Sequence, residues 1–200
     1  MRGKTDRGNE SAVRKAAIRL AGECGASRAD ILDALGLPMD KGLASICKDQ
    51  RCGGYGFSAS CPPHVMNPDA FEKEIPRFHS ALAFQFSVHT DILFGDQRHE
   101  VLRVVHETAS AIRKNALESG AARAMAIAAG PCKQIFCGAY NQCEKVHGNG
   151  RCRHPDEACP SMSGLGISFR EISRRLGWDD DQKDGNGKSL SAMSGIVLLG

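Results

Sequence analysis

The placement of cysteines constrains this chain more than any other feature of its sequence. Nine of its 200 residues are cysteines, and all but Cys24 fall into two groups. The first group consists of Cys47, Cys52 and Cys61, and two prolines follow the last of these. The second group consists of Cys132, Cys137, Cys143 and Cys152, with Cys159 close behind. Clustering of this kind predicts metal ligation, and an iron–sulfur site before any other.

The first residues of the chain contain no apolar stretch of the kind found in a secretory leader, so we expect a cytoplasmic protein. Structural disulfides are rare in a reducing cytoplasm, and this favours metal ligation over cross-linking. The net charge of +3 is too small to indicate nucleic-acid binding. The most apolar segment, residues 121–130, is too short to span a bilayer. We therefore expect neither nucleic acid nor membrane as a partner.

The apolar pattern predicts an α/β fold with a small sheet of three to four strands and cysteine-rich metal-binding loops. Residues 81–88 and 124–129 have the composition of strands, and a long helix is expected between them, capped by Asp96. Such a strand–helix–strand unit most simply forms a right-handed parallel crossover. A last short strand at 196–199 could join the sheet.

The buried face of that long helix is expected at helical spacing. Its residues are Val101, Val104, Val105, Thr108, Ile112, Ala116 and Leu117. Further helices are expected at 10–24, at 28–35 after a Ser27 cap, at 68–76 after an Asn67 cap, and at 169–176 with Ser168 and Glu171 as a capping box. Trp178 is expected to fold back on the last of these helices.

We expect a single metal-binding domain over residues 1–200. Its segments are N-terminal helices in 1–36, an irregular first cysteine loop in 37–66, a core in 81–130, a second cysteine loop in 131–166, and a helix, flexible link and last strand in 167–200.

The first cysteine group has three thiols in a glycine-rich setting, where the backbone can bend around a metal. Three thiols leave a tetrahedral site incomplete, so a fourth ligand must come from elsewhere or one metal position stays open. Cys159, His64 and a water or substrate are the alternatives for that position. Three buried, unligated cysteines are a further alternative, but a polar, glycine-rich segment is poor core material.

The second group brings four thiols into about twenty residues of chain, enough to close a four-thiolate site locally. Zinc would accept this set as well as an iron–sulfur cluster, although zinc sites more often have closer pairs. Basic residues surround the group and would offset thiolate charge: Lys133, Lys145, Arg151 and Arg153.

Apart from His64, the histidines are less favoured as ligands than the cysteines. His147 and His154 lie near the second group, where an isolated histidine is more often a hydrogen-bonding residue. Four others carry no pattern and are expected at the surface: His79, His89, His99 and His106. The phosphate-binding and dinucleotide-binding glycine motifs are absent, as is the nucleophile elbow of the hydrolases.

Several of these motifs together resemble a known prokaryotic family called predicted metal-binding protein. The motifs are Cys47 to Cys52-Gly-Gly-Tyr55-Gly56, Cys61-Pro-Pro63, Ala129-Gly130-Pro131-Cys132, Cys152-Arg-His-Pro155 and Pro160-Ser161-Met162. The resemblance spans roughly residues 20 to 200. It implies a cysteine-bound metal in a small α/β domain and no particular reaction.

Three functions remain open at this point. The first is an iron–sulfur protein with two centres of the four-iron type, which would serve electron transfer or redox support of a partner enzyme. Cys132, Cys137, Cys143 and Cys152 would hold one centre, and Cys47, Cys52 and Cys61 the other, with Cys159 as fourth ligand. The second is an iron–sulfur enzyme with an open metal position at the three-cysteine site, where Tyr55 and His64 would be the nearest groups for proton transfer. The third is a structural zinc module for protein binding.

Overall fold

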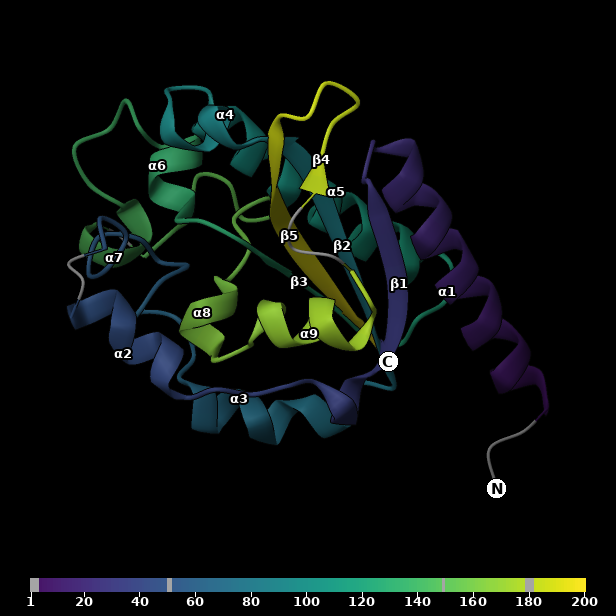
Figure 1. The fold of residues 1–200 in the computed structure, drawn as a ribbon. Helices are drawn as coiled ribbons and strands as arrows, with labels where there is room; N and C mark the ends of the chain where they lie inside the picture. Colours follow the sequence, from purple (N-terminus) through teal and green to yellow (C-terminus); the bar gives the residue numbers. More distant parts are fainter. Residues whose placement is uncertain (1–3, 50–51, 149, 179–181) are drawn as a thin grey trace.

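The computed structural model describes residues 4–49, 52–148, 150–178 and 182–200 (Figure 1). Its centre is a five-stranded antiparallel sheet. Four strands lie side by side in the order β1 (Arg28–Asp33), β2 (Ser80–His89), β5 (Ser189–Leu199) and β3 (Ala124–Ala128). The fifth, β4 (Gln182–Lys183), pairs with the start of β5. The α/β class is confirmed, with one strand more than expected.

The strand–helix–strand unit is present, but its strands do not pair with each other. The connection between β2 and β3 passes through α4 (Thr90–Phe94) and α5 (Arg98–Glu118). β5 lies between β2 and β3 and is antiparallel to both. β2 and β3 therefore run parallel to each other, as the predicted crossover requires, but they are not neighbours in the sheet. The interspersed serines and glycine of 189–195 concealed the length of β5, since only its last residues form an apolar run.

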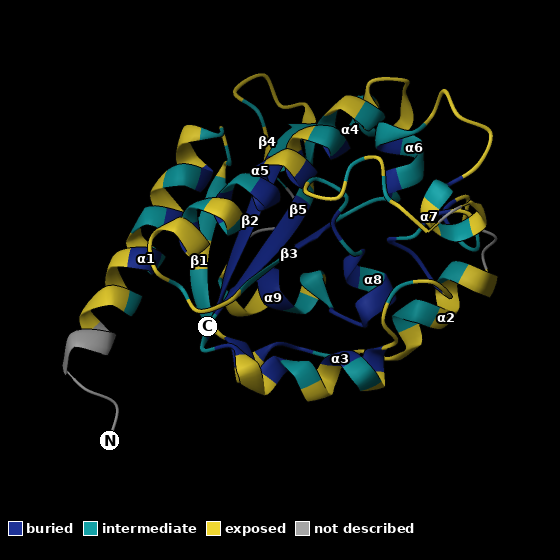
Figure 2. Ribbon diagram, turned by 180° about the vertical axis from the view of Figure 1, so that it is seen from behind, coloured by how far each residue is buried: buried dark blue, intermediate teal, exposed yellow. Residues whose placement is uncertain are grey.

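Two layers of helices bury the two faces of this sheet, as the dark central strands of Figure 2 show. One face packs against α1 (Lys4–Glu23) and α5, with Leu82, Phe84 and Val197 in the core between them. The other face packs against α3 (Pro68–Glu74), α8 (Met162–Leu165) and α9 (Phe169–Arg175). Because side chains alternate along a strand, the two cores are independent.

Two segments differ from the sequence-based expectation. Residues 28–33 form an edge strand instead of a helix, because β2 offers a full ladder of backbone partners from Arg28 to Asp33. Asp33 then caps a short 3₁₀ helix, Ala34–Gly36, by accepting from the Leu35 amide at 2.9 Å. The loop expected over 37–66 contains α2 (Gly42–Asp49), at whose start Asp40 accepts from the Gly42 amide.

The long helix also differs in detail. Gln97, and not Asp96, occupies its N-cap position. Its buried side chains include Val105, Thr108 and Ile112 as expected, whereas Val104 and Leu117 are exposed.

Local signals elsewhere are confirmed. Asn67 accepts from the Ala70 amide and caps α3. Ser168 accepts from the Glu171 amide and caps α9, and the Trp178 ring lies 6.2 Å from the Phe169 ring. In the polar link expected at 179–191, residues 179–181 lie outside the described part of the chain, and the rest belongs to the β4–β5 hairpin.

Both cysteine segments lie at one end of the sheet, beyond the carboxyl end of β3. This end carries the short helices α6 (Cys132–Phe136) and α7 (Glu144–His147) next to α2 and α8 (Figure 1). Among the described residues, no helix is both long and apolar enough to cross a membrane.

Candidate metal centre

A tight turn delivers Cys132 to this end of the sheet. Gly130 follows β3 with φ of +91°, and a Cβ there would lie 2.9 Å from the Leu102 side chain. Both conditions exclude a larger residue. Pro131 then precedes α6, so that Cys132 is the first residue of the helix and its side chain is buried.

The thiols of the second group share one electrostatic environment. Burial raises the pKa of Cys137, and negative charge on Cys132, Cys152 and Cys143 raises it further. Arg153 opposes this effect. Such mutual influence requires the four sulfur atoms to lie near one another. The structure thus brings together the four cysteines that the sequence groups.

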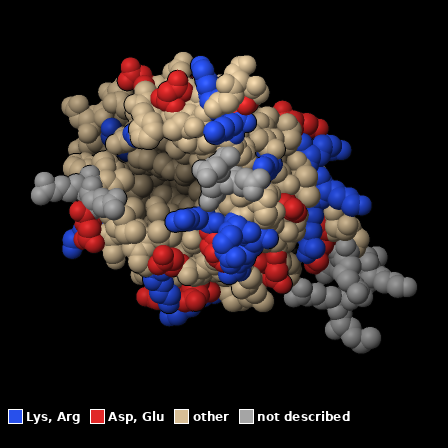
Figure 3. Space-filling model, viewed as in Figure 1, with Lys and Arg blue, Asp and Glu red and all other residues tan. Residues whose placement is uncertain are grey.

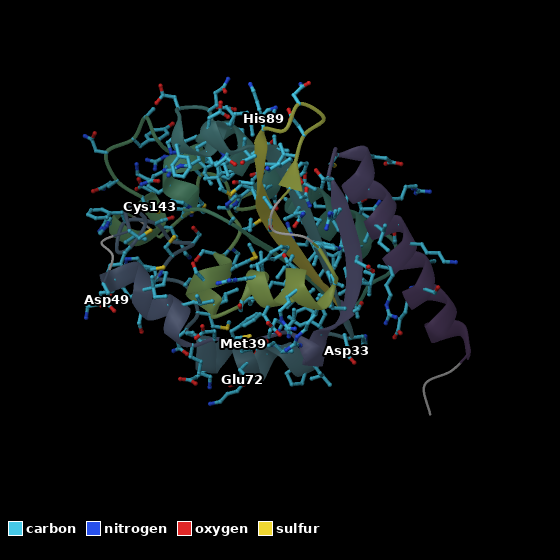
Figure 4. The ribbon with its side chains drawn as sticks, in the orientation of Figure 1. Asp33, Met39, Asp49, Glu72, His89 and Cys143 are labelled. Atoms are coloured by element: carbon cyan, nitrogen blue, oxygen red, sulfur yellow. The ribbon has the colours of Figure 1, made fainter. Side chains whose placement is uncertain are left out.

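Cys152 confirms this neighbourhood from its own side. Burial raises its pKa, the His154 amide bonded to its sulfur at 3.4 Å lowers it, and the charges of Cys132 and Cys143 raise it. Figure 4 shows sulfur atoms near the labelled Cys143, between α2, α6 and α7.

Basic side chains fix the loop around these thiols. Arg153 bonds Glu144 at 2.8 Å, and its guanidinium lies 4.0 Å from the centre of the Tyr140 ring. Lys133 donates to the carbonyls of Cys137 at 2.9 Å and Tyr140 at 2.6 Å. The cations whose charge lowers the pKa of these thiols are Arg153, which acts on Cys137, and Lys145, which acts on Cys152.

The first cysteine loop is fastened to the start of α6 by two serines. Ser60 accepts from the Cys132 amide at 3.0 Å, and Ser58 accepts from the Lys133 amide at 3.2 Å. The Ser58 hydroxyl also lies 3.2 Å from the Cys132 sulfur. These bonds satisfy amides that a helix start leaves free, a role that Pro131 cannot fill. Sequence analysis does not reveal the capping role of either serine, because the amide that each one binds lies more than seventy residues away.

Cys61 lies at the junction of the two loops. It is buried, and burial raises its pKa to about 11. Hydrogen bonds from Ser60 and Ser58 lower this pKa, whereas the charges of Cys132 and Cys52 raise it. A Cβ on Gly54 would lie 2.6 Å from Pro131 and 2.9 Å from the Cys61 sulfur. Only glycine permits this approach of the two loops.

The other two thiols of the first group lie further out. Cys47 is in α2, and its sulfur lies 3.7 Å from the Ser163 hydroxyl of α8. Cys52 is exposed, and its amide donates to the Cys47 carbonyl at 3.1 Å.

Cys159 occupies a different setting. Its side chain belongs to the apolar core between the sheet and α5, and burial raises its pKa to about 12. Its sulfur lies 3.7 Å from the His106 carbonyl. The charge of Cys132 also raises the pKa of Cys159, and this places Cys159 near the second group.

His106 is buried, not exposed as expected. Its Nε2 lies 3.1 Å from the Ala129 carbonyl, and its Nδ1 lies 3.2 Å from the Cys159 amide and 3.1 Å from the Glu157 carbonyl. In the tautomer with the proton on Nε2, the ring donates to Ala129 and accepts from the Cys159 amide. Burial lowers its pKa. His106 follows Val105 on the buried face of α5. The sequence pattern did not reveal this, because a polar residue is not expected in the core.

A column of rings connects His106 to the second cysteine loop. The His106 ring meets the edge of Phe136 at 5.6 Å, and Phe136 stacks on His154 at 5.3 Å. His154 is therefore a packing residue beside Cys152. The exposed His147 lies 6.3 Å from His64, whose Nε2 is 3.1 Å from the Gly56 carbonyl. Tyr55 is half-buried in the same loop.

An open pocket of about 660 Å³ separates the two cysteine loops. Gly53 and Phe57 line it on one side, and Lys133, Gln134 and Cys143 on the other. Within the described ranges, no three His, Cys, Asp or Glu side chains converge closely enough to hold one metal ion. Cys143 is the one cysteine among the described residues that line this pocket. Thiolates are ligands that soft metals prefer.

The comparisons with known proteins support metal binding without identifying the metal. Residues 30–199 match the family described as "Predicted metal-binding protein (DUF2284)". No curated protein and no solved structure matches the chain. Because the match covers most of its length, the chain belongs to this family of predicted metal-binding proteins.

Proposed function

We propose that this member of the predicted metal-binding family is an iron–sulfur protein that serves electron transfer or redox support of a partner enzyme. The observation that carries the proposal is the shared environment of four thiols, Cys132, Cys137, Cys143 and Cys152. Four thiolates from one loop are the usual ligand set of a four-iron cluster.

The spread of these thiols favours a cluster over zinc. A single zinc ion holds all four sulfurs about 2.3 Å from one point. In a cluster each thiolate binds a different metal atom, so the sulfurs stand further apart. Thiols that influence one another without converging on one point suit the second arrangement better.

The surroundings favour a bound anionic group that exchanges electrons. Arg153 and Lys145 supply positive charge beside Cys137 and Cys152, and such charge would stabilise a reduced, more negative cluster and raise its potential. The adjacent pocket opens to solvent, so an electron would have a short path to the surface for a partner protein to receive.

A second centre is proposed on Cys47, Cys52 and Cys61. Hydrogen bonds of Ser58 and Ser60 hold this loop against Cys132, so the two centres would be neighbours. We keep Cys159 as the proposed fourth ligand, although its contacts with His106 mean that the core would have to open for it to reach that centre.

Metal and sulfide analysis of protein purified without oxygen tests the proposal. We expect about eight irons and as many sulfides per chain, with broad absorbance in the visible region. Cys137→Ser should lower the iron content by about half, whereas Cys24→Ser, outside both groups, should leave it unchanged. Colourless, iron-free protein would refute the proposal, and stoichiometric zinc would indicate a structural module instead.

The open pocket favours one second candidate, an iron–sulfur enzyme whose three-cysteine centre leaves a metal position for substrate. Its test is Cys159→Ala. Unchanged iron content and spectrum would support an open position, and loss of one cluster would make Cys159 a ligand and argue against the enzyme.

A further inference from the structure

The face of the sheet beneath α9 changes character along its length. On β2 the side chains on this face are Ala81 and Ala83, and then Gln85. On the neighbouring β5 they are Leu198 and Ile196, and then Ser194, which pairs with Gln85 in the register of the sheet. The apolar floor therefore becomes polar at one level on both strands.

This polar floor is buried. Gln85 is 2% exposed, Ser194 5%, and Ser173 of α9, which lies above them, 5%. Other buried serines near the cysteine loops have clear backbone partners, as Ser60 does. Within the described part of the chain, no hydrogen bond is formed by the side chains of Gln85, Ser173 or Ser194. Among the described residues, the buried side-chain nitrogen and oxygen atoms that lack a partner are those of His89 and His99. The polar atoms of Gln85, Ser173 and Ser194 therefore reach open space, where a ligand can bond them.

All three side chains line one cavity of about 230 Å³ between α9 and the β4–β5 hairpin. A second cavity of about 320 Å³ adjoins it and shares Phe169 and Arg170 as lining residues. The second cavity extends to Gly130 and to Ser163, the neighbour of the Cys47 sulfur. The polar cavity therefore lies beside the candidate metal centre but outside it.

Figure 3 shows this face of the molecule hollowed over the region bounded by α6, α8 and β5. The recess is lined with uncharged residues, and a basic side chain lies at its lower rim.

Among the described residues that line the two cavities, Arg170 alone is charged. Its neighbours on α9, Arg174 and Arg175, are both paired with Glu171, at 2.7 and 3.1 Å. Arg170 forms no ion pair with any described residue. A guanidinium without a carboxylate partner, at the mouth of a hydroxyl-lined cavity, is suited to bind the carboxylate of a ligand.

We propose that the cavity beneath α9 binds a small hydroxycarboxylate. The carboxylate would bind Arg170, and the hydroxyl groups would bond Gln85, Ser173 and Ser194. A volume of about 230 Å³ equals roughly seven or eight water-sized groups. Acids of three or four carbons fit that size. The proposal stands on the polar floor and Arg170, and it does not depend on which metal the cysteines hold.

Calorimetric titration of the protein as purified tests the proposal with three matched probes. Glycerate has both the carboxylate and the hydroxyls, propionate has only the carboxylate, and glycerol has only hydroxyls. We expect glycerate to bind at least about tenfold more tightly than either of the others. Inorganic phosphate is titrated as a fourth probe. Equal binding of propionate, or tighter binding of phosphate, would overturn the ligand class. If none of the four probes binds at a concentration of about 20 mM, the site itself is refuted.

Two variants and one control locate the binding. Arg170→Gln should weaken glycerate binding about tenfold or more, because a charge-assisted bond is lost. Arg174→Gln, one turn further along the same helix, should leave binding within about twofold. Gln85→Leu should also abolish binding, while the melting temperature of the ligand-free protein should change little, because Leu has a similar volume and no hydrogen bond to a described residue is lost. Binding unchanged in Arg170→Gln or Gln85→Leu would refute the assignment.

Discussion

Replacement of His106 by Phe should destabilise the protein by about 2–4 kcal/mol. The Ala129 carbonyl would lose its ring donor, and a buried unpaired carbonyl costs about 1–3 kcal/mol. The Cys159 amide would lose its bond to Nδ1, which is worth about 1 kcal/mol net because that amide also contacts the Glu157 carbonyl at 2.8 Å. Phe has a similar shape, so the ring contact with Phe136 should remain.

The same substitution should change how stability depends on pH. Burial holds the pKa of His106 below that of free histidine. The unfolded chain therefore takes up a proton below about pH 6.5 that the folded chain does not accept. Neutral His106 makes its full contribution to the free energy of unfolding above about pH 6.5. Below that pH the free energy of unfolding falls by up to about 1.4 kcal/mol per pH unit, until the pH reaches the lowered pKa of the folded protein. The variant should lack this contribution.

Urea unfolding at pH 7.5, 6.0 and 5.0 measures both effects. The control is His99→Phe on the same helix, since the Nε2 of His99 has no partner among the described residues. That variant should stay within about 1 kcal/mol of the original protein. If His106→Phe were as stable as the control at pH 7.5, or kept the full decline towards pH 5.0, the bridging role of His106 would be refuted.

Three further predictions concern the loops and the sheet. Ser60→Ala should lower the free energy of unfolding in urea by about 1–3 kcal/mol, because the Cys132 amide loses its acceptor. The control Ser45→Ala, on the exposed side of α2, should lower it by less than about 0.5 kcal/mol. Equal effects of the two substitutions would contradict the capping role of Ser60. Gly195→Ala should lower thermal stability by about 1–3 kcal/mol because its Cβ would overlap the Phe84 ring, and Phe84→Leu in the same chain should recover part of that loss. Metal removal should speed hydrogen exchange in the cysteine loops while the central strands stay protected; uniform loss of protection would show that metal holds the whole fold together.

Short-range features of the structure were accessible from sequence. The Asn67 and Ser168 caps act on amides three residues away, and both are confirmed. The strands β2 and β3 and the helix α5 between them were found from composition and period. The same kind of local signal failed at 28–33, where a capping pattern suggested a helix and pairing with β2 imposed a strand.

Sequence alone predicted a metal-binding protein from two dense groups of thiols, and the family match supports that prediction. Tertiary structure decided which thiols are neighbours, and it did so through contacts between residues far apart in the chain. Ser58 meets the Cys132 sulfur across 74 positions, and His106 meets the Cys159 amide across 53. It also decided that β5 lies in the middle of the sheet and that Gln85 and Ser194 form a buried polar floor. Caps and periods act within a turn or two of chain, whereas these arrangements depend on how the whole chain packs, and no short window of residues encodes that packing.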